Sequence, residues 1–168
     1  MHRKHFFLMV IGCTIILLDQ ITKSLVQSQF ELHESMIVID GFFALTYIQN
    51  PGAAFGFMAE QGAAFRGVFF TIISIIALIL LSVIFRQTPN EDTLALIAVS
   101  LLFGGAIGNM IDRIRLGKVV DFLDFFIGRH HWPAFNVADS SITVGVSLMM
   151  FHLFLQKKQV TQEPDGRD

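Results

Sequence analysis

The chain has 168 residues, of which 53% are hydrophobic and only 15% are charged, and its mean hydropathy is +0.60. Soluble domains carry about 25% charged residues, so this composition predicts an integral membrane protein, and the length allows one membrane domain over residues 1–168. The formal net charge of −2 provides no footprint for nucleic acid, and the single cysteine, Cys13, excludes an intrachain disulfide and a cysteine-based metal site.

The first apolar stretch covers residues 6–26 and follows a short basic start with Arg3 and Lys4. As a helix it is long enough to span a hydrocarbon core of about 30 Å. Residues Val10-Ile11-Gly12-Cys13 resemble a lipobox, which leaves open a cleaved signal peptide. Because the apolar run continues past the cysteine and three more spans follow, we expect this stretch to be the first transmembrane helix.

Residues 36–57 predict a small β-sheet at the membrane surface. Two apolar runs, 36–39 and 42–48, are joined by Asp40-Gly41, which is a strong hairpin signal. Asn50-Pro51-Gly52 then predicts a turn, after which residues 53–57 are a candidate for a further strand.

Two uncharged spans follow, over residues 67–85 and 93–111. The second of them ends in small residues, including Gly104, Gly105 and Gly108, and small residues let helices approach closely in lipid. This part of the chain therefore predicts a tightly packed helix pair.

Between residues 122 and 132 apolar side chains are interspersed with charged ones, so we expect an interfacial helix here. A fourth span over residues 134–155 and a polar tail over 156–168 complete the chain. The predicted fold is an all-α membrane protein with four transmembrane helices, a small sheet on the periplasmic or extracellular side, and one interfacial helical segment.

Four spans place both termini on the same side of the membrane. Basic residues divide evenly, six on each side, so their number does not decide the orientation. We expect Arg3-Lys4 and Lys157-Lys158 to be left free rather than held in the protein, which favours both termini in the cytoplasm.

The unusual polar residues then converge at the outer ends of the spans. Ionisable groups at membrane depth are costly and usually functional. These residues are Asp19, Lys23, Asn50, Asn109, Asp112, Arg113, Asp121, Asn136 and Asp139.

Asp121 and Asp139 are the candidate catalytic pair. Two carboxyl groups close together in a poorly solvated place do not both ionise cheaply, so one keeps its proton and the other is a base. Such a pair can activate a water against an amide and protonate the leaving nitrogen without a metal or a cofactor. Alternatively, each is a helix cap or an ion-pair partner, and Asp139 before Ser140-Ser141 fits a cap.

The remaining polar residues have structural interpretations as well. Asp19 and Lys23 are four residues apart and predict a buried ion pair on one helix face. Asp112 and Arg113 are expected to pair similarly, although Arg113 alternatively donates to a substrate carbonyl. The amides of Asn50 and Asn136 suit a carboxylate or an extended peptide, or else mark a turn and a helix start. The histidines show no metal-binding pattern.

Three functions remain open at this point: a peptidase that uses the two aspartates, a small transporter or proton channel with acids at its outer face, and a lipid-binding subunit without chemistry. The two uncharged spans argue against a transport path lined by acids.

Four blocks of the chain resemble lipoprotein signal peptidase, the bacterial signal peptidase II family of aspartic peptidases. The blocks are residues 19–23, residues 50–56, residues 108–113 with 117–122, and residues 135–142, in the order in which the family has them. The resemblance implies an endopeptidase of the bacterial cytoplasmic (inner) membrane that cuts the signal peptide from a prolipoprotein just before a cysteine carrying diacylglycerol.

Carried over by position, the resemblance implies that Asp121 and Asp139 are the catalytic pair. It implies substrate-binding or supporting roles for Asn50, Gly52, Asn109, Arg113, Asn136 and Ala138, and structural roles for Asp19, Lys23 and Asp112. It further implies membrane lipid as a partner and a pocket for the antibiotic globomycin and similar inhibitors; a monomer would suffice.

Overall fold

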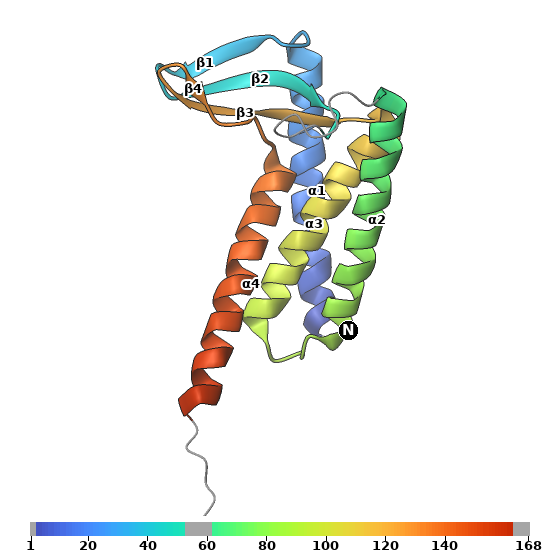
Figure 1. The fold of residues 1–168 in the computed structure, drawn as a ribbon, viewed down its shortest axis with the longest axis vertical. Coiled ribbons are helices and arrows are strands. Elements are labelled where there is room, and N and C mark those ends of the chain that lie inside the picture. The colour runs from blue at the N-terminus through green and yellow to red at the C-terminus, as the bar shows by residue number, and fades with distance from the viewer. Residues whose placement is uncertain (1–2, 53–61, 163–168) are drawn as a thin grey trace, which may run out of the picture.

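The structure is a computed structural model that describes residues 3–52 and 62–162. Its described residues form four long helices that run side by side, with a small antiparallel sheet across one end (Figure 1). The helices are α1 (Arg3–Gln29), α2 (Ala63–Gln87), α3 (Thr93–Leu116) and α4 (Val137–Gln162). Each is long and apolar enough to cross a membrane, so the prediction of four transmembrane helices is confirmed.

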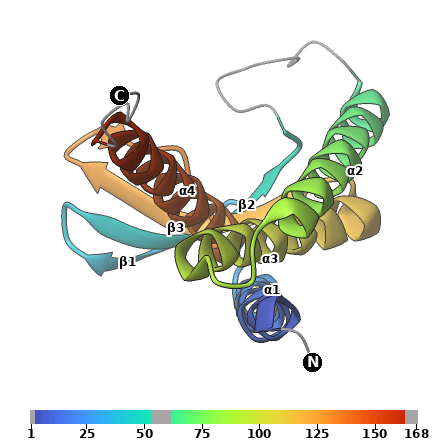
Figure 2. The same ribbon diagram turned by 90° about the horizontal axis from the view of Figure 1, so that it is seen from below.

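Helix α3 is the central element. It packs against α1, α2 and α4, as the view along the bundle shows (Figure 2). Half of its most apolar window is buried inside the protein, against at most 17% for the other three helices. The outward-facing apolar side chains of α1, α2 and α4 are therefore available to lipid, whereas α3 supplies the protein core.

Small residues allow α3 to lie this close to its neighbours. A Cβ atom added at Gly104 would come within 2.8 Å of Ile15 on α1, and one at Gly105 would come within 2.5 Å of the Ala138 carbonyl oxygen on α4. Real Cβ atoms do not approach other atoms this closely, so only glycine fits. The prediction of close helix packing at this end of α3 is confirmed.

The sheet contains β1 (Ser35–Ile39), β2 (Phe43–Asn50), β3 (Val119–Ile127) and β4 (His130–His131), adjacent in that order. Strands β1 and β2 form the predicted hairpin around Asp40-Gly41, with Gly41 at a φ of 72° that favours glycine. The strand expected over 53–57 lies outside the described residues.

The interfacial helix expected between 122 and 132 is wrong, because this segment belongs to β3 and β4. Strand β3 pairs with β2 so that Asp121 lies opposite Ile48 and Asp124 lies opposite Ala44. Its backbone groups are satisfied by a strand far away in the sequence. A pattern of phenylalanines with scattered charges does not reveal such a partner, which is why a local interpretation favoured a helix.

Two further expectations need correction. The fourth helix begins at Val137 rather than at 134, because Phe135 forms an isolated bridge with Leu123 of β3. The basic start is also not free: Arg3 donates to the Asn90 carbonyl at 3.1 Å and to the hydroxyl of Thr93 at 2.6 Å.

Lys4 likewise donates to the Arg86 carbonyl at 3.2 Å. The charges used to orient the chain are thus partly held by the α2–α3 connection. The start of α1 and the end of α4 nevertheless lie at the same end of the bundle, away from the sheet (Figure 1).

Candidate active site

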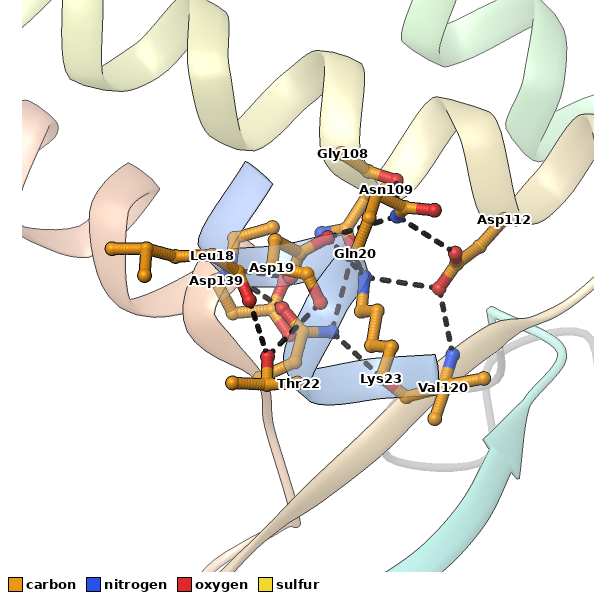
Figure 3. Close-up of polar contacts among 12 residues, drawn as sticks. Leu18, Asp19, Gln20, Thr22, Lys23, Gly108, Asn109, Asp112, Val120 and Asp139 are labelled. Atoms are coloured by element: carbon orange, nitrogen blue, oxygen red, sulfur yellow. Dashed lines mark hydrogen bonds and ion pairs between the residues drawn. The ribbon is translucent and has the colours of Figure 1, made fainter. Parts of the chain in front are cut away.

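A buried ion cluster joins α1 to α3 at the end of the bundle beneath the sheet (Figure 3). The Lys23 ammonium lies 2.8 Å from Asp19 Oδ2 and 2.9 Å from Asp112 Oδ2. The predicted pair of Asp19 and Lys23 is therefore confirmed. The predicted pair of Asp112 and Arg113 is wrong, because neighbouring residues of a helix point in different directions and Asp112 faces α1.

The two acids of this cluster also fasten the next elements. Asp19 Oδ1 accepts the backbone N–H of Ala138 at 2.9 Å, at the start of α4. Asp112 Oδ2 accepts the backbone N–H of Val120 at 3.1 Å, at the start of β3. Both aspartates that are candidates for catalysis follow directly after these anchored residues.

Gln20 belongs to the same cluster, and sequence reasoning did not assign it a role. Its amide donates to Asp112 Oδ1 and to the Gly108 carbonyl, both at 3.1 Å. A glutamine beside Asp19 within an apolar helix was the available signal.

Asp121 lies on β3 and is only 2% exposed. Asn136 donates to its Oδ1 at 2.8 Å and Asn50 donates to its Oδ2 at 2.9 Å. Burial, together with the negative charge of Asp139, raises the pKa of Asp121 to about 7, and the two amide hydrogen bonds oppose this rise.

Asp139 lies in the first turn of α4. Its Oδ1 accepts a hydrogen bond from the Asn109 amide at 2.7 Å, and its backbone N–H donates to Asn136 Oδ1 at 2.8 Å. The cap of α4 is therefore Asn136 and not Asp139. Asn136 is fully buried and connects the two aspartates, so both of its interpretations from the sequence hold.

Three asparagine amides face the carboxylates with their nitrogen ends. The oxygen end of each is occupied by a group that only donates: the Gly52 N–H for Asn50 at 2.9 Å, the Asp139 N–H for Asn136 at 2.8 Å. For Asn109 the donor is the Lys23 ammonium at 3.0 Å. Because these donors cannot accept, the orientation of each amide is determined.

Both aspartates line one cavity of about 720 Å³, a size suited to a ligand. Asn50, Gly52 and Arg113 also line it, whereas Asn109, Asn136 and Ala138 do not. The rest of the wall is formed by Phe70, Trp132, Pro133, Ala134, Phe135, Ser140, Thr143 and Val144. The cavity is thus mainly apolar, with its acids, amides and one guanidinium gathered together.

Two features shape the wall on the side of α2. Arg113 donates to the Ser74 hydroxyl at 3.3 Å, which holds the guanidinium between α3 and α2. Gly52 has a φ of 89°, and a side chain there would clash with the Phe70 ring. The predicted turn at Asn50-Pro51-Gly52 therefore brings backbone close to α2 where only glycine fits.

Comparison with known proteins gives consistent matches over most of the chain. Residues 11–155 match the family described as Signal peptidase (SPase) II. A lipoprotein signal peptidase from Syntrophus aciditrophicus (strain SB) is 49% identical, covering 91% of this chain and 94% of that protein. One from Geobacter sulfurreducens is 46% identical, covering 86% of this chain and 89% of that protein.

Two solved structures, both described as bacterial membrane enzymes studied by the in meso method, have similar folds. The first has a TM-score of 0.79 and 36% sequence identity, and the match covers 96% of this chain and 93% of the chain in that structure. The second has a TM-score of 0.77 and 39% sequence identity, and the match covers 87% of this chain and 91% of the chain in that structure.

Proposed function

This chain belongs to the signal peptidase II family, and on that premise we propose that it removes signal peptides from diacylglyceryl-modified prolipoproteins as an aspartic endopeptidase. Asp121 and Asp139 are its catalytic pair. One observation carries the assignment: the buried carboxyl group of Asp121 and the partly buried one of Asp139 line the same apolar cavity, and the side-chain amide of Asn136 connects the two residues by donating to Asp121 Oδ1 and accepting the backbone N–H of Asp139.

The reaction follows from a pair that shares one proton. The ionised carboxylate takes a proton from water, whose oxygen attacks the carbonyl carbon of the amide before the lipidated cysteine. The protonated carboxyl then donates to the leaving nitrogen as the C–N bond breaks. Water is thus divided between a new carboxyl end and a new amino end. Arg113 donates to the carbonyl oxygen as charge develops there.

The surroundings of the pair support a lipid-bearing substrate. Acyl chains attached to a cysteine remain in the membrane, so the bond beside that cysteine is held near the membrane surface. Asp121 lies on β3 of the sheet and Asp139 in the first turn of α4, at the end of the bundle that the sheet covers, and the cavity wall is largely apolar. In our proposal this end faces outward, and both termini are cytoplasmic.

We also propose that globomycin-type inhibitors occupy the same cavity and that the enzyme works as a monomer. One chain supplies both aspartates, their amide partners and the cavity wall, which supports the second point. No specific observation favours a transporter: α2 contains no acidic residue, and the only acid within α3 is Asp112 near its end.

The direct test is cleavage of a lipid-modified prolipoprotein by the purified protein in detergent. Asp121→Asn and Asp139→Asn should each lower kcat by about 10²–10⁴-fold, the usual contribution of a general acid or base. Asp124→Asn is a matched control on the same strand, because Asp124 bonds to His131 and does not line the cavity. It should change kcat less than about threefold. Cleavage at the wild-type rate by both test variants would exclude the aspartic mechanism.

A further inference from the structure

We propose that Lys23 is a positioning residue for the catalytic pair, which acts on Asp139 by fixing the orientation of the Asn109 amide. This inference rests on the proposed roles of Asp121 and Asp139. It gives α1 a part in catalysis, although Lys23 does not line the cavity.

All three N–H groups of the Lys23 ammonium have a partner. The side chain is 2% exposed and carries three donors. Two of them go to Asp19 and Asp112, at 2.8 and 2.9 Å. The third goes to the amide oxygen of Asn109 at 3.0 Å. The two carboxylates already more than balance the single charge of the ammonium, so the third bond has a separate consequence.

That consequence is the direction of the amide. Asn109 Oδ1 accepts from Lys23 and also from the Asn136 amide at 3.2 Å, so its nitrogen points at Asp139 Oδ1 at 2.7 Å. A flipped amide would place N–H groups against an ammonium and an oxygen against a carboxylate. All three hydrogen bonds would be lost, and each would become a repulsive contact: two between donors, at Lys23 and Asn136, and one between acceptors, at Asp139.

Asn109 differs in this respect from the other two amides of the site. The oxygen ends of Asn50 and Asn136 accept backbone N–H groups, which no substitution of a side chain removes. Asn109 is held by backbone groups at neither end. The orientation of the Asn109 amide therefore depends on side chains, and Lys23 is the only cation among the three that bond to it.

The charged side chains around Asp139 determine how the loss of Lys23 affects its ionised form. Lys23 and Asp19 face it from α1, Arg113 from α3 and Asp121 from β3. Without Lys23 the pair loses a nearby cation, and the Asn109 oxygen keeps only the longer, uncharged bond from the Asn136 amide at 3.2 Å, so the orientation that directs its nitrogen to Asp139 is held less firmly. Both changes disfavour the ionised form of the pair.

The test uses Lys23→Met in the full-length protein with a lipid-modified prolipoprotein. We expect kcat per folded molecule to fall about 10–100-fold, the value of a hydrogen bond to a charged group, with KM changed less than about threefold. The acid limb of the kcat profile should move to higher pH. A merely structural lysine would lower the folded yield and leave both kcat and the limb unchanged.

Three additional variants keep the test decisive if Lys23→Met does not fold. The double variant Lys23→Met/Asp112→Asn retains the net charge of the cluster, and Asp112→Asn alone retains the contact from Lys23 to Asn109. The acid limb should move in the double variant and return in Lys23→Arg, which restores the cation. Wild-type kcat and limb in a folded double variant would overturn the proposal. Asp139→Asn, measured in parallel, reports separately on the catalytic pair.

Discussion

At the scale of single residues, the site depends on amides whose direction is determined by donors. Asn136 is the clearest case, since its oxygen caps α4 while its nitrogen binds Asp121. The same side chain therefore starts the helix that carries one aspartate and holds the other. Any change at this position affects both carboxyl groups together.

The pKa of Asp121 near 7 predicts how activity depends on pH. The pair works when one carboxyl is protonated and the other ionised, so kcat should pass through a maximum below pH 7. Above about pH 7 the second proton is lost and kcat should fall roughly tenfold per pH unit. A profile that stays flat from pH 5 to 9 would contradict a shared proton.

The same pKa has a consequence for stability. In the unfolded chain an aspartate loses its proton near pH 3.9, whereas folded Asp121 keeps it up to about 7. Its favourable contribution is therefore present below about pH 4 and is lost as the pH rises through 7. Asp121→Asn should then raise the unfolding temperature at pH 8 relative to the wild type, with little change at pH 4.

Sequence reasoning identified the residues of the site better than their partners. Asp19 and Lys23 were paired correctly because they are four apart on one helix. Asp112 was assigned to Arg113, although its partner lies on another helix. Spacing along the chain carries no signal for contacts between helices, so the sequence indicated that the amides of Asn50 and Asn136 suit a carboxylate but not which aspartate each of them binds.

At the scale of elements, the glycines of α3 determine where α1 can lie. A Cβ atom at Gly108 would come within 2.6 Å of Asp19 Oδ2 and 3.3 Å of the Ala138 Cβ. The position of the ion cluster thus depends on a missing side chain. Helix existence was predictable from apolar length, whereas β3 was not, because its partner β2 lies far away in the sequence.

Gly108→Ala should displace Asp19 and disturb the ion cluster. We expect a loss of about 1–3 kcal/mol in stability, as for other overpacked sites, together with a fall in kcat of tenfold or more. Gly12→Ala is the matched control on the facing surface of α1, since its Cβ would meet nothing closer than 3.9 Å. Thermal unfolding in detergent and the cleavage assay should separate the two, and equal behaviour would refute the packing argument.

At the scale of the whole molecule, the bundle has two chemically different ends. The sheet lies at one end, and the start of α1 and the end of α4 lie at the other (Figure 1). The ion cluster bonds to the start of β3 and the start of α4, and the cavity is lined by Asp121 and Asp139 from the same two elements, so both lie at the end with the sheet. The count of basic residues did not decide which end faces the cytoplasm, and the structure shows Arg3 and Lys4 held by carbonyl and hydroxyl groups. Orientation is therefore a matter for direct measurement.

Single cysteines introduced into a Cys13→Ser background measure the orientation of the chain in the membrane. Asp40→Cys lies in the exposed hairpin loop and Gln156→Cys near the end of α4, also exposed. A membrane-impermeant maleimide added to intact spheroplasts should label the first and should reach the second only after the membrane is permeabilised. The opposite pattern would invert the proposed orientation.

The placement of Asp139 on the last helix has a consequence for the order in which the protein is made. A chain still being synthesised that has not yet reached α4 already contains Asp121, Asn50 and the ion cluster of α1 and α3. It lacks Asp139, and it also lacks Asn136, which holds Asp121 in place. If the two aspartates are the catalytic pair, as we propose, the nascent protein contains no complete pair until its final helix joins the bundle, and we expect cleavage to begin only after assembly ends.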